Sequence, residues 1–156
     1  MTVSTDRPTR GDYPYAVTLQ TRWMDNDAYG HVNNVAYYSW FDTAANLFLV
    51  REAGLDIHHG PVIGLVVESG CRYHAPVAYP EPVVVGVRVD KLGTSSLGWG
   101  LAVFRAGDDH PRAVAHGHFV HVFVDRTTRR PTPIPPAMRA ALETIVSPVG
   151  RARDSV

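Results

Sequence analysis

Residues 34–53 constrain the fold more than any other segment of the chain. They read NVAYYSWFDTAANLFLVREA, which is rich in Val, Tyr, Trp, Phe, Leu and Ala, and Gly54 follows as a typical helix-ending residue. The interior polar positions keep helical spacing: Ser39, Asp42, Thr43 and Asn46. Because so narrow a polar stripe has to be almost surrounded by protein, the rest of the chain must supply a sheet that wraps this helix.

Five further segments have the patterns of β-strands. Residues 15–23 and 83–91 alternate between two faces, as half-buried strands do. Residues 61–74 are rich in valine, and 97–106 alternate large apolar residues with glycines and other small residues. The last strand, 112–124, follows a GDDHP turn.

The order of these elements predicts an α+β protein. Pro135 or Pro136 suits the first turn of a short C-terminal helix. Short links between the last four strands favour an antiparallel sheet. We expect one domain over residues 13–146, with a flexible N-terminus (1–12) and a flexible tail (147–156).

Composition excludes several classes of protein. The chain has 156 residues, and its 15 basic residues balance its 15 acidic ones. No net field therefore draws it to nucleic acid or to an anionic membrane. A single cysteine, Cys71, excludes an intrachain disulfide framework. The polar N-terminus lacks an apolar signal core and no run could span a membrane, so we expect a cytoplasmic protein.

The densest cluster of polar chemistry lies between Arg22 and Asn34, where a strand ends and the long helix starts. One interpretation is a turn-rich loop in which Asn33 or Asn34 caps the helix. The other is a reaction site, because unpaired amides at a helix start stabilise developing negative charge beside an upstream carboxylate. Spacing alone leaves both open.

The segment RWMDNDAYGHVNNVAYYSWFDTA resembles the signature of the 4-hydroxybenzoyl-CoA thioesterase-like branch of the hotdog-fold family. The shared pattern is an aromatic residue, Asp-x-Asp, glycine, a Val-Asn-Asn helix start and an aromatic-acidic pair. The Glu68…Tyr73…Pro76 segment and VDKLGTSSL (89–97) add weaker matches. The resemblance implies a hotdog fold, in which a five-stranded antiparallel sheet wraps around the long helix.

The resemblance also implies roles for two residues. Asp27 matches the catalytic carboxylate, which acts on the thioester as nucleophile or as base for water. Asn34 matches the residue whose backbone N–H polarises the thioester carbonyl. A thiol leaves with a pKa near ~8.5, so such a site needs no strong general acid and no cofactor.

Other side chains are candidates for substrate binding. Tyr29, Tyr37 and Tyr38 are close enough in sequence to line the carbonyl site. His31 is either structural or in contact with substrate. Glu68 either forms an ion pair with a basic neighbour or orients substrate across a dimer interface.

Basic and hydroxyl groups near two turns are candidates for binding the CoA phosphates. Lys91, Ser95 and Ser96 surround the turn between the third and fourth strands, and Arg126 follows the last strand near two further arginines. The alternative for each is a solvated surface residue.

The histidines do not predict a metal site. His116 and His118 share one face of a strand, whereas His121 points to the other, which breaks the ligand set of His116-x-His118-x-x-His121. We therefore expect no metal.

The sequence as a whole favours a thioesterase acting on an acyl-CoA or an acyl-carrier-protein thioester. A non-catalytic acyl-thioester binding protein on the same fold is the alternative. A hotdog hydratase or dehydratase fits less well, because the usual histidine-centred pattern is missing. An open sheet edge, together with the resemblance, predicts a homodimer or a dimer-based tetramer.

Overall fold

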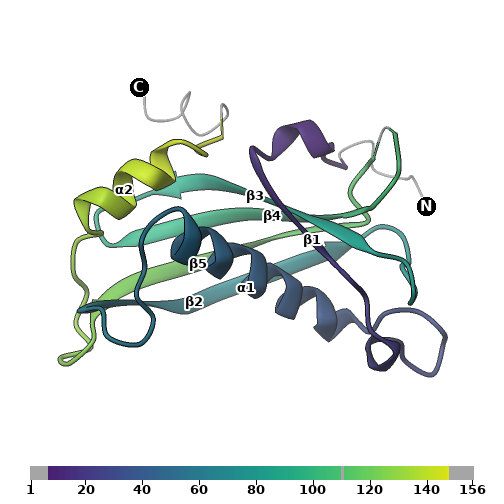
Figure 1. The fold of residues 1–156 in the computed structure, drawn as a ribbon, viewed down its shortest axis with the longest axis horizontal. Helices are drawn as coiled ribbons and strands as arrows, with labels where there is room; N and C mark the ends of the chain where they lie inside the picture. Colours follow the sequence, from purple (N-terminus) through teal and green to yellow (C-terminus); the bar gives the residue numbers. More distant parts are fainter. Residues whose placement is uncertain (1–6, 110, 148–156) are drawn as a thin grey trace.

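The computed structural model describes residues 7–109 and 111–147 as one antiparallel sheet crossed by a long helix (Figure 1). The strands are β1 (Tyr15–Leu19), β2 (Val62–Tyr73), β3 (Val83–Leu92), β4 (Ser96–Arg105) and β5 (Ala115–Asp125), and the helices are α1 (Asn34–Arg51) and α2 (Pro136–Glu143). Neighbouring strands pair antiparallel in the order β1-β3-β4-β5-β2. This arrangement confirms the predicted α+β class and hotdog architecture.

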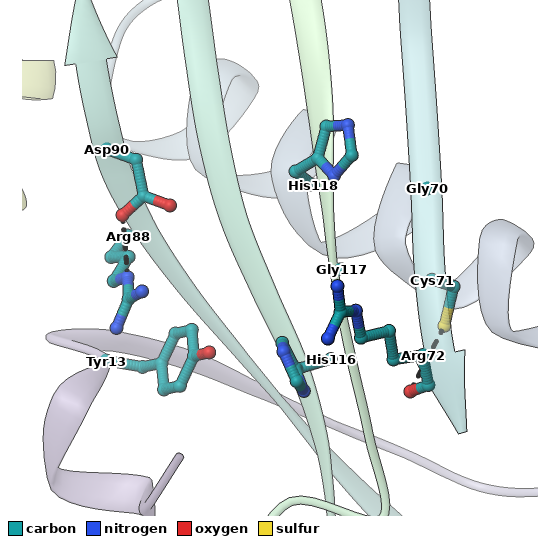
Figure 2. Close-up of a pocket in the computed structure, with 9 residues that line it drawn as sticks. All are labelled: Tyr13, Gly70, Cys71, Arg72, Arg88, Asp90, His116, Gly117 and His118. Carbon is teal, nitrogen blue, oxygen red and sulfur yellow. Dashed lines mark hydrogen bonds and ion pairs between the residues drawn. The ribbon is translucent and has the colours of Figure 1, made fainter. Parts of the chain in front are cut away.

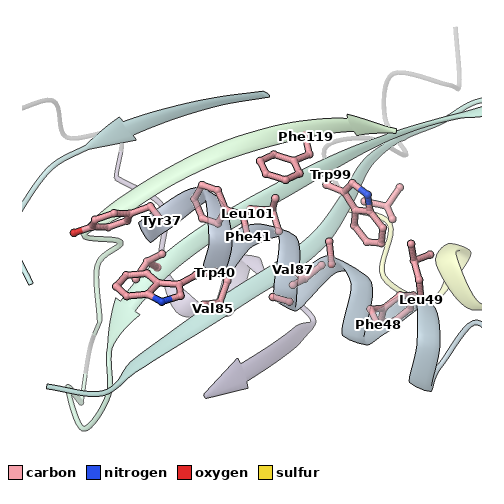
Figure 3. Packing of buried hydrophobic residues seen from close by; sticks show 14 of the residues in the cluster. Tyr37, Trp40, Phe41, Phe48, Leu49, Val85, Val87, Trp99, Leu101 and Phe119 are labelled. Atoms are coloured by element: carbon pink, nitrogen blue, oxygen red, sulfur yellow. The ribbon is translucent and has the colours of Figure 1, made fainter. Parts of the chain in front are cut away.

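The core lies between α1 and one face of the sheet (Figure 3). Alternate residues of each strand point toward α1, because successive side chains of a strand face opposite ways. Phe48 packs edge-on against Trp99 with ring centroids 6.1 Å apart, and Phe41 packs against Phe119 at 6.1 Å. Burying each such side chain stabilises the fold by about 1.5–3 kcal/mol.

The ends of α1 follow the sequence signals closely. The Asn33 side chain accepts a hydrogen bond from the Val35 N–H at 3.1 Å, so Asn33 is the cap. Gly54 has a φ of 71°, a left-handed conformation that glycine adopts without strain. The helix is less enclosed than predicted, because the sheet covers only one side and leaves Val35 66% and Val50 41% exposed.

Two strand boundaries differ from the prediction by more than one residue. β1 stops at Leu19, and the chain turns into a short 3₁₀ helix at Trp23–Asp25, because the Asp25 carboxylate accepts the Arg22 N–H at 2.7 Å. β5 begins only at Ala115, since Arg112 is bridged to Thr9 instead.

Part of the predicted flexible N-terminus has a defined structure. Residues 7–12, within the segment predicted to be flexible, form a 3₁₀ helix at Arg10–Asp12 and contact the segment before β5. Residues 1–6 and 148–156 lie outside the described part of the chain. Within that part, neither helix has the length and apolar character to cross a membrane.

Acid should destabilise the core through His121. This side chain is 2% exposed, and its Nδ1 accepts a hydrogen bond from Trp99 Nε1 at 3.2 Å. Burial lowers the pKa of His121, so the unfolded chain takes up a proton at a higher pH than the folded protein does. Stability should therefore fall as the pH drops below about 6.5, the ordinary pKa of histidine.

Melting curves between pH 7.5 and 5.0 test this expectation. His121→Asn keeps an acceptor for Trp99 but cannot gain a charge, so its melting temperature should fall less with pH than that of the parent protein. His59→Asn is the matched control, because the His59 side chain is 88% exposed. An equal pH dependence in His121→Asn and the parent would contradict the assignment.

Candidate functional site

The loop between β1 and α1 folds back on itself and carries Asp27 to the start of the helix. The Asn33 N–H donates to the Asp25 carbonyl at 2.8 Å, and the Asp27 N–H donates to the His31 carbonyl at 2.9 Å. Gly30 closes the turn with a φ of 81° and donates to the Asp27 carbonyl at 3.1 Å. Residues 25–27 therefore run antiparallel to residues 31–33.

An ion pair with a buried carboxylate holds this loop in place. The Asp25 side chain is 2% exposed and accepts from the Arg22 guanidinium at 2.8 Å and 3.0 Å. The Val32 N–H donates to the Val77 carbonyl at 2.8 Å, which fastens the loop to the segment after β2. Asp25 therefore orders the loop.

Asp27 leaves part of its carboxylate free. Its Oδ1 accepts the Tyr29 N–H at 2.8 Å, and no described residue donates to Oδ2. The residue is half-buried, so solvent and small molecules reach it. One oxygen is thus positioned by the loop while the other is available for chemistry.

The first turn of α1 leaves one amide free as well. The cap takes the Val35 N–H, and the Ala36 N–H donates to the Asn33 carbonyl at 3.0 Å. No described group outside the helix accepts the Asn34 N–H. A carboxylate and an unpaired helix-start amide therefore belong to one hydrogen-bonded loop, the combination that stabilises an oxyanion.

Tyr73 joins this site without having been predicted as a member of it. Its hydroxyl donates to the Asn34 carbonyl at 3.2 Å, and its ring packs on Tyr37 at 5.1 Å. Burial raises the pKa of Tyr73, so the hydroxyl stays protonated as a donor. The contact fixes the end of β2 against the start of α1. The sequence does not predict it, because an aromatic residue in a strand does not show which distant segment it will contact.

The predicted substrate-binding side chains around the helix start differ in how deeply they are buried. Tyr37 is 3% exposed and packs on Trp40 at 5.0 Å, as a core residue does. Tyr38 is half-buried and stacks on Phe119 at 6.2 Å. Tyr29 is 89% exposed and His31 is exposed too, so one protomer does not enclose a pocket around them.

Glu68 lies on the face of the sheet away from α1, which we call the outer face. A register shift between Val66 and Glu68 turns the strand there. The Glu68 carboxylate lies 3.1 Å from His118 Nε2, within hydrogen-bonding distance of this neighbour. His121 points to the opposite face, and no group of metal-binding side chains is found in residues 7–109 and 111–147.

The predicted CoA-binding residues lie at the other end of the sheet from Asp27. Lys91, Ser95 and Ser96 surround the β3–β4 turn, and the Ser95 carbonyl accepts the Phe123 N–H at 2.7 Å. The Arg126 N–H donates to the Pro61 carbonyl just before β2 begins.

The distance between these two ends follows from β2 itself. Tyr73, the last residue of β2, contacts the start of α1, while Val62, the first, pairs with Asp125. Twelve strand residues span roughly 35 Å, so one protomer does not bring Asp27 and Arg126 together. The Arg126 guanidinium is also engaged, since it donates to the Gly60 and Ile57 carbonyls at 2.6 and 2.8 Å.

Exposed apolar side chains surround the loop and follow β2. Trp23 is 81% exposed and Met24 73%. β2 is an edge strand with unpaired backbone groups along one side, and it exposes Leu65, Val66 and Val67, the last by 61%. Edges and patches of this kind mark surfaces that another chain covers.

Comparisons with known proteins give one consistent assignment. A family model described as the thioesterase-like superfamily matches residues 21–142. The PA5185 protein from Pseudomonas aeruginosa is 51% identical, with a TM-score of 0.88 over 91% of this chain and 98% of that one. PA2801, a putative thioesterase from the same species, is 32% identical, with a TM-score of 0.77 over 83% and 98%.

More distant structures share the fold. A 1,4-dihydroxy-2-naphthoyl-CoA thioesterase from Synechocystis is 17% identical, with a TM-score of 0.72 over 82% of this chain and 94% of that one. No curated protein sequence matches the chain.

Proposed function

Because the chain belongs to the thioesterase-like superfamily and is a thioester hydrolase, we propose that it cleaves acyl- or aryl-CoA thioesters with Asp27 and the Asn34 amide as its catalytic groups. The observation that carries this proposal is the free Oδ2 of Asp27 in the loop that leads to the unpaired Asn34 N–H. Asp25 and Tyr73 act as positioning residues, since each fixes one side of that loop and helix start.

The reaction follows from these two groups. The thioester carbonyl accepts the Asn34 N–H, and the helix dipole adds to the stabilisation of the oxyanion that forms on it. The Asp27 carboxylate attacks the carbonyl carbon directly or removes a proton from an attacking water. The C–S bond then breaks and CoA leaves as a thiolate, which takes up a proton to become the free thiol. On the base route, the attacking water has already supplied the oxygen of the carboxylic acid. On the nucleophilic route, a water molecule then hydrolyses the anhydride between the acyl group and Asp27, which releases the acid and restores the carboxylate.

We infer that two protomers complete the site by pairing their β2 strands antiparallel. Antiparallel pairing places the Val62 end of one β2 beside the Tyr73 end of the other. Lys91, Ser95, Ser96 and Arg126 of the partner then approach the Asp27 loop, which they do not reach within one protomer. The exposed apolar residues Leu65, Val66 and Val67 support this arrangement, because pairing buries them.

Within this dimer the other predicted residues take distinct places. Tyr29 and His31 are exposed ring side chains of the same loop as Asp27, so we assign them to contact with substrate. Tyr38 borders the exposed side of α1, whereas Tyr37 supports the site from within the core. Glu68 is assigned to its contact with His118 rather than to substrate.

A thiol-release assay tests the proposed function directly. Free CoA is measured with a thiol reagent over aryl-, short-, medium- and long-chain CoA esters, and acyl-carrier-protein thioesters form a separate arm. An aryl ester belongs in the panel because the Synechocystis relative is a naphthoyl-CoA thioesterase. The protein has one free cysteine, Cys71, so protein without ester serves as the blank.

We expect turnover with at least one ester of CoA. Measurable binding of an ester without any thiol release would instead identify a non-catalytic acyl-thioester binding protein. Water addition to an enoyl ester without thiol release would identify a hydratase.

A further inference from the structure

The outer face of the sheet carries a cavity of about 360 Å³ that the proposed reaction does not use (Figure 2). It lies on the side of the sheet opposite α1 and is lined mainly by polar side chains. The lining comprises Tyr13, Gly70, Cys71, Arg72, Arg88, Asp90, His116, Gly117 and His118. This volume falls in the range of sites that hold small molecules.

Glycines on three strands make room for the side chains around this cavity. A Cβ at Gly70 would meet the His118 ring at 2.6 Å, and one at Gly86 would meet Tyr13 at 2.8 Å. A Cβ at Gly100 would meet the Arg88 Nε and an Asp90 oxygen at 2.7 Å. The polar side chains therefore lie flat on the sheet, which leaves the space above them open.

Tyr13 presents its hydroxyl to this space. The residue is 3% exposed, and no described residue forms a hydrogen bond with its hydroxyl. Figure 2 shows this hydroxyl pointing into the cavity, toward His116. Burial raises the pKa of Tyr13 to about 12, so the hydroxyl is a donor at neutral pH. The hydroxyl therefore faces the cavity as a donor that an acceptor group on a ligand can reach.

Two arginines border the same space. The Arg88 Nε donates to Asp90 at 2.7 Å, and its guanidinium lies 4.7 Å from the centroid of the Tyr13 ring. Its two terminal nitrogens have no acceptor among the described residues. The guanidinium of Arg72, which reaches from β2 toward His116, has none either.

The positive charge lies at the Arg72 side of the cavity. Arg88 is paired with Asp90, and the Glu68 carboxylate lies 3.1 Å from His118 Nε2, so Arg72 is the lining cation without a carboxylate partner among the described residues. His74 Nε2 lies 2.7 Å from His116 Nδ1, so these two rings share one proton. Burial and then the positive charges of Arg7 and Arg72 lower the pKa of His74, so positive charge acts on this side of the cavity.

We propose that this outer-face cavity binds the oxyanion of a small ligand, a carboxylate or a phosphate, through Arg72, the terminal nitrogens of Arg88 and the Tyr13 hydroxyl. Guanidinium groups and a phenol hydroxyl all donate hydrogen bonds, and an ionised carboxylate or phosphate accepts them. The site is independent of the thioesterase reaction, because Asp27 belongs to the loop at the start of α1 and the sheet separates α1 from the cavity.

Calorimetric titration at pH 7.5 tests the proposal, with sodium phosphate and sodium benzoate as separate probes and sodium chloride at matched ionic strength as the reference. We expect saturable binding of one phosphate or one benzoate per chain. The preferred probe shows whether the oxyanion is a phosphate or a carboxylate.

Two variants in the cavity and two controls outside it test whether binding occurs there. Arg72→Gln and Tyr13→Phe should each weaken it by about tenfold or more, since a hydrogen bond to a charged group contributes that much. Arg51→Gln, at the exposed end of α1, is the matched control and should bind as the parent does. Asp27→Asn should also bind as the parent does, which separates this site from the catalytic one.

Several outcomes would overturn the proposal. These are the absence of saturable binding with both probes, or binding that Arg72→Gln leaves unchanged. A lower oligomeric state of Arg72→Gln in sedimentation would also overturn it, because the outer face would then be a contact between copies of the chain. Arg72 is exposed, so its variant decides the question even if Tyr13→Phe lowers the melting temperature.

Discussion

Replacing Asp27 with asparagine should abolish most turnover while leaving the fold intact. Asparagine keeps an oxygen that can accept the Tyr29 N–H, so the loop loses no hydrogen bond at that position. It has no carboxylate to attack the thioester or to take a proton from water. We expect kcat to fall by about 1,000-fold, the scale of losing one nucleophile or general base, with a smaller change in KM.

The matched control is Asp42→Asn. Asp42 lies on the exposed side of α1 and accepts only from Asn46 at 3.0 Å, so this variant removes a carboxylate without touching the loop. Rates are measured by thiol release and folding by circular dichroism. Wild-type turnover in Asp27→Asn would show that the carboxylate lies elsewhere, and the superfamily assignment would still stand.

The sequence predicts the architecture well because each element carries its own local signal. The apolar run of α1 ends at a glycine with positive φ and starts at an asparagine cap, and both features depend only on neighbouring residues. Valine alternation in β3 gives the face that packs on α1, since Val83, Val85, Val87 and Val89 are all fully buried.

Contacts between distant parts of the chain are harder to predict. Nothing in the Glu68–Pro76 segment shows that Tyr73 reaches the Asn34 carbonyl, because this depends on the register of β2 against β5 and on the shift after Val66. The outer-face cavity is hidden for the same reason. Its members come from β2, β3, β5 and the segment before β1, and only the assembled sheet brings them together.

Local signals also mislead where a loop replaces a strand. Residues 15–23 alternate throughout, yet β1 ends at Leu19, because the Arg22–Asp25 pair bends the chain into a turn. That turn is part of what directs Asp27 toward the helix start. A departure from the strand pattern therefore coincides with the proposed site, as expected where function rather than stability selects the conformation.

A charge on the free edge of β2 should separate the protomers and thereby remove activity. Val67 is 61% exposed at the bulge of this edge strand, so Val67→Asp disturbs little within one protomer. In a β2–β2 dimer, the same carboxylate lies against its own copy near the two-fold axis and is buried without a partner. We expect a monomer in sedimentation and a kcat/KM lowered by about 100-fold, since the CoA-binding end of the partner is lost.

Ala140→Asp is the control for added charge, because Ala140 is exposed on α2 and far in sequence from the edge strand. It should keep both the dimer and the activity. A Val67→Asp protein that stays dimeric and active would place the interface on another surface.

Mixing two inactive variants tests whether the site is shared between protomers. Asp27→Asn removes the carboxylate, and Lys91→Ala removes a cation proposed to act from the partner. After subunit exchange, a mixed dimer has one site with both residues intact and one with neither. Equal mixing should therefore restore about a quarter of the wild-type sites in a two-fold dimer. If each protomer held a complete site of its own, mixing would restore no activity beyond the average of the two variants.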